Sequence, residues 1–428
     1  MKIRGHAPGP APAPTAFAPF SWIVVRGAPR WWSLRVRQVF EKVDLILRNP
    51  PPERVSKNLP SRRRGMWNRT DWRFSAVCCA GFAVTAPCID WGIGGRMQVG
   101  FFFWPFSPGL VTRMAQAAER YGYDMVGIAD TPGNAMDPWV AMTLAAQAAS
   151  KPRIALCVSN LTTRHPATTA AAIASVDLIA PGRAVLGIGT GHSSPQNLGI
   201  PASAVGDLEA GLRFLRALLT GTPASYRGGE AHLPWVTRPS PVFLAASGPK
   251  ALVVAGRAAD GAFINFGLLR ENIMHSETIV QSSASASGRG PEDVELWQIA
   301  ALDCHRDAAV ARGKIGAILG FMAGGYILRS ADLAERGVRA HQRPAIRELR
   351  RRYSTRPGAA DAARVAELGL FDYLSSRFAI FGTPEDCREH LIKAREAGLG
   401  RVMFTVSLAS DPLATVELFG REVLPTLR

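Results

Sequence analysis

RIALCVSNLTTRHPATTAAAIASVDLIAPGRAVLGIGTGH, Arg153–His192, decides the fold of this chain. A short apolar run ends in Ser159–Asn160 and is followed by a helix start at His165–Pro166. Proline suits the first helical turn, because the N–H that it lacks would have no intrahelical partner there. An Ala-rich helix to about Ala180 then leads into a second apolar run. The stretch predicts a strand, a helix and a second strand in succession.

Similar apolar runs recur along the chain from Met97 onward, separated by helical stretches. They are QVGFFFWP from Gln98, DMVGIAD from Asp124, PVFLAAS from Pro241, GAFINFG from Gly261, LWQIAALDCH from Leu296 and RVMFTV from Arg401. Eight buried strands that alternate with helices predict a closed α/β barrel of the (β/α)8 TIM type. In such barrels the chemistry lies at the carboxyl ends of the strands.

Two stretches interrupt this alternation. The Gly- and Pro-rich segment between Gly221 and Ser240 contains SYRGGEAHL, which predicts a short hairpin. Between Arg306 and Phe381 there is room for several helices outside the barrel. We therefore expect an insertion before the last strand.

The first 96 residues differ from the rest in composition and charge. They hold 16 Lys and Arg against 5 Asp and Glu, which gives +11 of the total charge of +16 and leaves +5 for residues 97–428. They are also rich in Pro and contain six of the ten Trp. We expect a barrel domain over 97–428, preceded by a disordered extension over 1–96 or by the product of a start upstream of Met97. The alternative is a basic arm that contacts nucleic acid or an acidic surface, which predicts salt-sensitive binding that is lost without residues 1–96.

The cysteines and the apolar stretches bear on the compartment. None of the six cysteines forms a CxxC pair or lies near a His at metal-ligand spacing, so we expect reduced thiols, no metal site and a cytoplasmic protein. No apolar stretch reaches the roughly 18 residues that span a membrane. Ala76–Ile89 is similar to the apolar part of a signal peptide but lies far inside the chain. We expect no membrane partner.

Polar residues follow the second and third predicted strands. Asp130 ends one of them, and there a carboxylate either contacts a ligand or caps the loop that begins at Thr131. Asn160 ends the other, where its amide is placed to contact a cofactor. His165, directly before a proline, has the position of a structural residue at a helix start.

Glycine and cationic residues follow the fourth and fifth predicted strands. The run Gly187–Ser194 lets a backbone approach a ligand closely, although a lone GxGxG is a weak signal. Ser247–Lys250 begins a helix, where exposed N–H groups, a hydroxyl and an ammonium group suit a phosphate. The alternative for this segment is a tight turn with a solvated Lys. No Ser-His-Asp order, carboxylate pair or HExxH is present, which favours an enzyme whose cofactor performs the chemistry.

Several of these segments together resemble one family. They occur in the order found in luciferase-like flavin-dependent oxidoreductases. In chain order they are MQVGFFF, YGYDMVGIAD, the stretch Arg153–His192 quoted above, PVFLAASGPKALVVAGRAADGAFIN and FGTPEDCREHLIKAREAGLGRVMF. The chain is most similar to the coenzyme F420-dependent branch that includes methylenetetrahydromethanopterin reductase. The resemblance covers roughly residues 97–428. It implies a barrel with an insertion, a homodimer, and a flavin or deazaflavin bound at the strand ends.

The resemblance also implies roles for individual residues. It predicts a cis peptide between Cys157 and Val158, in a bulge behind the cofactor ring. The cofactor-binding set that it implies is Asp130, Cys157, Val158, Asn160, Thr190, Gly191, Ser247, Gly248, Lys250 and Ala251. Sugar-phosphate dehydrogenases of the family carry His and Glu where this chain has Thr131 and His192, which argues against that substrate class. His192 is the candidate to exchange a proton.

The leading hypothesis is hydride transfer between coenzyme F420 and an unknown small organic substrate. The first alternative is an FMN-dependent monooxygenase that uses O2. The second alternative is a protein of another class. It would be either a catalytically silent barrel that binds a cofactor, or a nucleic-acid-binding protein. Turnover with a reduced flavin would eliminate the silent protein.

Overall fold

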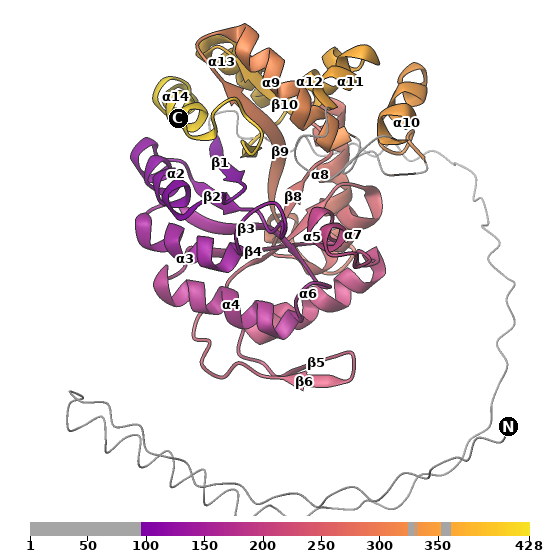
Figure 1. Cartoon of the computed structure of the whole chain (residues 1–428). Helices are drawn as coiled ribbons and strands as arrows, with labels where there is room; N and C mark the ends of the chain where they lie inside the picture. Colours follow the sequence, from indigo (N-terminus) through magenta and orange to yellow (C-terminus); the bar gives the residue numbers. More distant parts are fainter. Residues whose placement is uncertain (1–95, 324–329, 331, 352–360) are drawn as a thin grey trace, which may run out of the picture. The chain divides into compact units, whose positions relative to one another are not determined.

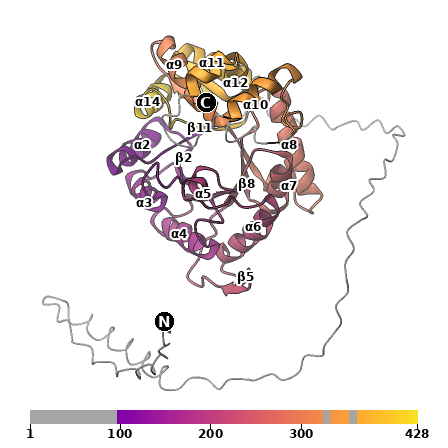
Figure 2. The ribbon, with the colours of Figure 1, turned by 45° about the vertical axis from the view of Figure 1, so that its right-hand side comes forward.

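Eight parallel strands form a closed ring (Figures 1 and 2) in the computed structural model, which describes residues 96–323, 330, 332–351 and 361–428. In order around the ring they are β1 (Gln98–Phe103), β2 (Met125–Ile128), β3 (Arg153–Asn160), β4 (Ala184–Gly189), β7 (Val242–Ala246), β8 (Gly261–Ile264), β9 (Glu295–Cys304) and β11 (Arg401–Thr405). β11 pairs with both β1 and β9, and β8 pairs with β9, which closes the ring. The predicted TIM-type barrel and its eight strands are confirmed.

Helices surround the ring on its outer side (Figure 2). They are α2 (Pro108–Tyr121), α3 (Pro138–Ala148), α4 (Pro166–Ile179), α6 (Val205–Leu219), α7 (Pro249–Ala258), α8 (Arg270–Ser285), α13 (Pro384–Glu396) and α14 (Pro412–Glu422), with short 3-10 turns η1 (Pro291–Asp293) and η4 (Leu424–Leu427). The short helix α5 (Ser193–Asn197) lies instead within the ring of helices in this view. Their starts follow the sequence signals. The Ser107 hydroxyl accepts a hydrogen bond from Leu110 N (3.3 Å) at the start of α2, and Thr383 and Asp386 form a capping box at α13.

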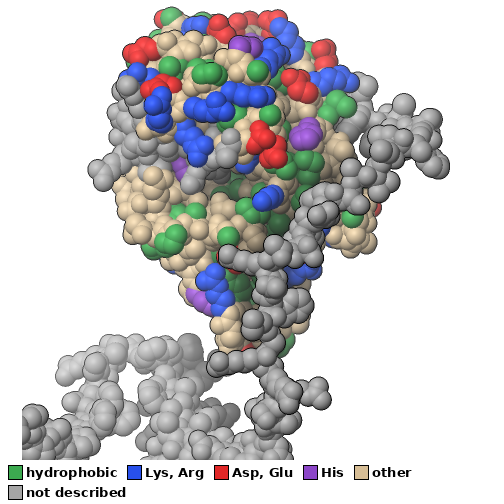
Figure 3. Space-filling view, turned by 90° about the vertical axis from the view of Figure 1, so that its right-hand side faces the viewer, with side chains coloured by type: hydrophobic (Ala, Val, Ile, Leu, Met, Phe, Trp, Pro, Cys, Tyr) green, Lys and Arg blue, Asp and Glu red, His purple; other side chains and the backbone are tan. Residues whose placement is uncertain are grey.

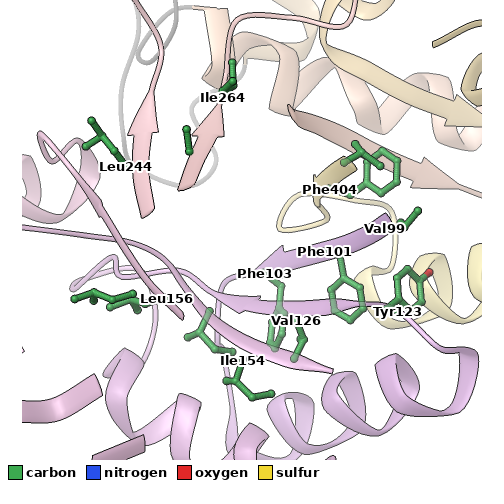
Figure 4. Packing of buried hydrophobic residues seen from close by; sticks show 14 of the residues in the cluster. Val99, Phe101, Phe103, Tyr123, Val126, Ile154, Leu156, Leu244, Ile264 and Phe404 are labelled. Atoms are coloured by element: carbon green, nitrogen blue, oxygen red, sulfur yellow. The ribbon is translucent and has the colours of Figure 1, made fainter. Parts of the chain in front are cut away.

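An aromatic layer fills the space between strands and helices (Figure 4). Phe101 and Phe103 from β1 are buried in it with Phe404 from β11. The rings of Phe101 and Tyr123 meet edge to face at 4.8 Å, and Phe404 packs on Phe419 of α14. Each buried aromatic side chain contributes on the order of 2–3 kcal/mol. Successive residues of a strand point to opposite faces of the sheet. The strand residues that alternate with these aromatic residues therefore face the barrel interior.

Large and small side chains face each other inside the barrel. Trp297 and Phe263 are buried there, and Gly187 of β4 leaves room for the neighbouring strand. A Cβ built at Gly187 would lie 2.1 Å from the Leu156 carbonyl oxygen and 3.1 Å from the Phe263 ring. A side chain at this glycine therefore cannot enter without displacing β3.

The insertion between β9 and β11 contains the expected helices and one strand that the sequence did not predict. The helices are α9 (Ala308–Phe321), α10 (Arg343–Arg351), α11 (Asp361–Glu367) and α12 (Phe371–Phe378), with the 3-10 turn η3 (Ala340–Gln342). The strand is β10 (Ala379–Gly382), which pairs with the last four residues of β9 outside the ring. The predicted hairpin is confirmed as β5 (Ala224–Tyr226) and β6 (Gly229–Ala231).

The predicted extension over residues 1–96 lies outside the described residues except for Arg96, which pairs with Asp124 at 2.8 Å. On the face in Figure 3, Lys and Arg side chains are interspersed with Asp and Glu over the upper part. That mixture agrees with the small net charge of residues 97–428. Among the helices that the structure describes, none has the length and apolar character needed to cross a membrane.

Candidate active site

The carboxyl ends of the barrel strands open into a cavity of about 570 Å³. Its volume lies in the range of roughly 300–1,000 Å³ that small-molecule sites occupy. All the site residues predicted from the sequence line this cavity: Asp130, Cys157, Val158, Asn160, Thr190, Gly191, His192, Ser247, Gly248, Lys250 and Ala251. Four neighbouring strands, β2, β3, β4 and β7, bring them together, because parallel strands of a barrel end on the same face.

Strand β3 carries a bulge at the cavity wall. The peptide bond between Cys157 and Val158 is cis, as predicted. The register of β3 against β4 shifts between Leu156 and Ser159. Val158 packs beside β4, where a Cβ built at Gly189 would lie 3.2 Å from its Cγ2 atom. The bulge therefore presents the Val158 side chain to the cavity.

Asn160 presents one fixed hydrogen-bond donor. Its side chain is buried, with 1% exposed. Its Oδ1 atom accepts from the backbone N atoms of Thr162 and Thr163, both at 2.9 Å, and from both hydroxyls at 2.8 and 3.2 Å. The Nδ2 atom is buried and has no partner among the described residues. A buried amide donor without a partner costs about 1–3 kcal/mol, so a ligand acceptor at this position would offset a real penalty.

Asp130 lies in a largely desolvated part of the wall. Burial raises the pKa of its carboxyl group, and the hydrogen bond from Ser159 opposes that rise. Ser159 Oγ donates to Asp130 Oδ2 at 2.6 Å. Arg164 also lowers the pKa of this carboxyl group but pairs with Asp137. The Asp130 carboxyl group is therefore held in one orientation at the cavity.

The loop after β4 brings His192 next to the insertion. Gly191 has a φ of +88°, in the left-handed region that favours glycine. His192 follows at the start of the five-residue helix α5, which the sequence did not predict. Its ring meets the Phe321 ring edge to face at 5.4 Å. A residue of the barrel and one of the insertion thus form one corner of the cavity.

The turn after β7 leads into a helix start that no side chain in the described part of the chain caps. Gly248 is the N-cap of α7 and Pro249 the first helical residue. The first backbone hydrogen bond of α7 runs from Leu252 N to Gly248 O at 3.0 Å, so the N–H groups of Lys250 and Ala251 precede it. These donors, the positive end of the helix dipole and the exposed Lys250 ammonium favour an anion.

Several cavity residues were not predicted. Asn265 follows β8, is 5% exposed, and its buried Oδ1 atom has no partner among the described residues. Thr405 ends the last strand and Ser407 follows it, with their hydroxyls 3.4 Å apart. Arg336 reaches the cavity from the insertion. The polar ends of GAFINFG and RVMFTVS were available as sequence signals, whereas Arg336 lies in no recognisable motif.

On the other side of the cavity, beside the polar Asn265, Thr405, Ser407, Glu335 and Arg336, lies a group of six apolar side chains, called the apolar wall here. It is made by Phe102, Trp104, Ile299, Ile318, Phe321 and Met322, from β1, its following loop, β9 and the insertion. In the part of the chain that the structure describes, no three His, Cys, Asp or Glu side chains are grouped closely enough to hold a metal ion. The side of the cavity away from the predicted cofactor residues thus carries both apolar and polar side chains.

Comparison with known proteins agrees with this architecture. Residues 91–401 match the family described as luciferase-like monooxygenase. The chain is 26% identical over 346 residues to a 5,10-methylenetetrahydromethanopterin reductase of Methanolobus tindarius, covering 77% of this chain and all of that protein. It is 27% identical to an F420-dependent glucose-6-phosphate dehydrogenase of Beutenbergia cavernae, over 76% of this chain and 94% of that protein.

The fold is also that of a solved relative. The structure of the coenzyme F420-dependent tetrahydromethanopterin reductase from Methanopyrus kandleri superposes with a TM-score of 0.65 at 22% identity, over 78% of this chain and all of that one. The family match and the F420-dependent relatives make the chain a luciferase-like oxidoreductase, and the barrel with a cavity at its strand ends agrees with that class. The chain belongs to the luciferase-like monooxygenase family.

Proposed function

We propose that this protein is a coenzyme F420-dependent oxidoreductase that transfers hydride between the deazaflavin and a small organic substrate. The observation that carries the proposal is the polar wall of the cavity. It holds a buried amide donor at Asn160 and a helix start at Lys250, and neither has a side-chain partner among the described residues. A cofactor that carries both a ring with a hydrogen-bond acceptor and a phosphate matches these two features, the ring acceptor at Asn160 and the phosphate at the helix start. The F420-dependent relatives named above support this choice of cofactor over FMN.

Each wall residue would then have a defined task. The N–H groups of Lys250 and Ala251, with the Lys250 ammonium, would bind the phosphate. Asn160 Nδ2 would donate to an acceptor atom of the ring, and Val158 would pack against the ring face. When bound, coenzyme F420 supplies the hydride chemistry. The protein residues fix its orientation and exclude water from the reacting atoms.

His192 is our candidate for the proton that accompanies hydride transfer. It lines the cavity between the predicted cofactor wall and Phe321 of the apolar wall. An imidazole exchanges protons near neutral pH, which suits a carbonyl, imine or activated alkene that gains a proton on reduction. Because six apolar side chains line the facing side, and Thr131 and His192 replace the residues of sugar-phosphate dehydrogenases, we favour an uncharged substrate.

A spectroscopic titration of the purified protein with coenzyme F420 and with FMN tests the cofactor. We expect saturable F420 binding, and turnover of bound reduced F420 by a carbonyl or alkene substrate. Tight FMN binding without F420 binding would overturn the choice and favour the O2-using monooxygenase that the family description allows. Binding of neither cofactor would contradict the proposal.

Lys250→Ala tests the phosphate turn. Loss of one charge-assisted hydrogen bond at an exposed site should weaken F420 binding about tenfold. Lys314→Ala is the matched control, because Lys314 is also exposed but does not line the cavity. Equal F420 affinity in the two variants would remove Lys250 from the site.

Two proposals that come from the family resemblance and the cysteines remain: the oligomeric state, which analytical ultracentrifugation tests, and the compartment, which cell fractionation tests. We propose a homodimer, which predicts twice the chain mass of 46.0 kDa in solution. We also propose a cytoplasmic protein, in keeping with the free, buried thiols of Cys157, Cys304 and Cys387. A monomer at micromolar concentration would contradict the first of these.

A further inference from the structure

Arg336, from the insertion, lies directly on the start of α7. A Cβ built at Gly248 would be 2.2 Å from Arg336 Nη1 and 2.3 Å from its Cζ and Nη2 atoms. The backbone at Gly248 has a φ of −164°, which any residue adopts. A glycine is therefore needed here because the guanidinium occupies the space of a side chain, and not because of the backbone conformation.

This position is unfavourable for a cation alone. The Nε and Nη1 atoms of Arg336 are buried and have no hydrogen-bond partner among the described residues. Burial lowers the pKa of this guanidinium group, and the nearby Arg377 lowers it further, against the opposing effect of Glu335. The positive end of the α7 dipole adds to this repulsion. An anion at the same place would pair with the guanidinium, the helix start and Lys250 at once.

Arg377 of α12 holds the Arg336 backbone in this position. Its side chain is fully buried and donates to the backbone oxygens of Arg336, Gly337 (3.3 Å) and Phe266 (2.8 and 3.1 Å). Its own backbone oxygen accepts from Leu268 N at 2.7 Å. The segment that carries Arg336 is therefore fastened to the loop after β8, and the placement of the guanidinium on α7 is built into the fold.

We propose that Arg336 is the second cation of the phosphate site and that the insertion supplies it. The guanidinium would bind two phosphate oxygens with its planar fork, opposite the α7 N–H groups. This inference rests on the proposed function, because the anion is the phosphate of the bound cofactor. A cofactor without a phosphate would then gain nothing from Arg336.

Fluorescence titrations with three probes test the inference: coenzyme F420, its deazariboflavin 5′-phosphate fragment, and the deazariboflavin alone. The last two differ only by the phosphate. Arg336→Ala should weaken binding of both phosphorylated probes about 10- to 100-fold, the range for losing hydrogen bonds to a charged group. It should leave the deazariboflavin unchanged. Arg336→Lys, which keeps the charge and loses the fork, should fall between.

Arg339→Ala is the matched control, because Arg339 is exposed in the same segment and does not line the cavity. It should bind all three probes as the wild type does. If Arg336→Ala binds F420 as tightly as the wild type does, the inference is overturned and the proposed function stays intact. Arg336 would give that result if it bound an anion of the substrate instead of the cofactor phosphate. Equal weakening of all three probes would also overturn it, since the effect would not depend on phosphate. A wild-type protein that binds none of the probes contradicts the proposed function itself.

Gly248→Ala gives an independent test through the same contact. The added methyl group should displace the guanidinium and weaken the phosphorylated probes selectively, with the melting temperature recorded to verify folding. In the Arg336→Ala background the same substitution should cost no further affinity, because its target is gone. Additive losses in the double variant would contradict the role assigned to Gly248.

Discussion

A buried carboxylic acid between α8 and β9 makes the stability of the barrel depend on pH. Glu277 is 8% exposed, and its Oε1 atom accepts one long hydrogen bond (3.4 Å) from Gln298 Nε2. Burial raises its pKa from 4.5 to about 7, although Gln298 and the charge of Arg401 oppose the rise. The folded protein therefore binds a proton here over a pH range in which the unfolded chain has released it.

The size of the effect follows from this difference in pKa. Each pKa unit corresponds to about 1.4 kcal/mol, so the shift of Glu277 corresponds to about 3 kcal/mol. The sign is that of a raised pKa: the stabilisation is fully present below pH 4.5 and is lost as the pH rises to about 7. Between pH 5.5 and 8 the loss amounts to about 2 kcal/mol. Glu277→Gln keeps an amide oxygen for Gln298 and carries no charge to desolvate.

Urea unfolding of the two proteins at pH 5.5 and pH 8 measures this directly. We expect the advantage of Glu277→Gln over the wild type to grow by about 2 kcal/mol between the two pH values. Glu271→Gln on the same helix is the control, because Glu271 is exposed, and it should show no such growth. A pH-independent difference between wild type and Glu277→Gln would refute the reasoning.

Two further substitutions test the barrel interior and the site. Gly187→Ala places a methyl group 2.1 Å from the Leu156 oxygen and should destabilise the protein by about 1–3 kcal/mol or more. Gly206→Ala is the control and should not destabilise the protein, because its methyl group would meet no described atom within 4 Å. Equal melting temperatures for the two variants would contradict the packing described. His192→Ala should lower kcat for hydride transfer by about 10²- to 10⁴-fold with the F420 dissociation constant unchanged. An unchanged kcat in stopped-flow measurements would exclude a proton-transfer role.

The barrel was predictable because its strands are short apolar runs that end in polar residues. Strand β10 was not, since the four residues from Ala379 to Gly382 directly follow a helix and precede a clear helix start at Thr383. The length of β9 was the overlooked signal. Gln298–Ala301 pair with β11, and Leu302–Cys304 extend beyond that pairing, so their buried backbone groups need other partners, which β10 supplies.

The convergence of the predicted cofactor residues was predictable for a different reason. Residues at the ends of neighbouring parallel strands must converge, so Asp130, Asn160 and the turn at Gly248 could be placed together without knowing any side-chain contact. Arg336 could not be placed in this way. Its position depends on the buried hydrogen bonds of Arg377, which join residues 41 positions apart along the chain. Local sequence carries no signal for such a contact.

The insertion therefore does more than shape the substrate side of the cavity. Phe321 packs against His192, and Arg336 lies against Gly248, so two of its residues touch the wall predicted to hold the cofactor. A change in the insertion that reshapes the apolar wall would also move a cation at the proposed phosphate site. Substrate choice and cofactor affinity should then change together when this segment is altered, and measuring both constants for each variant separates that coupling from an effect on substrate alone.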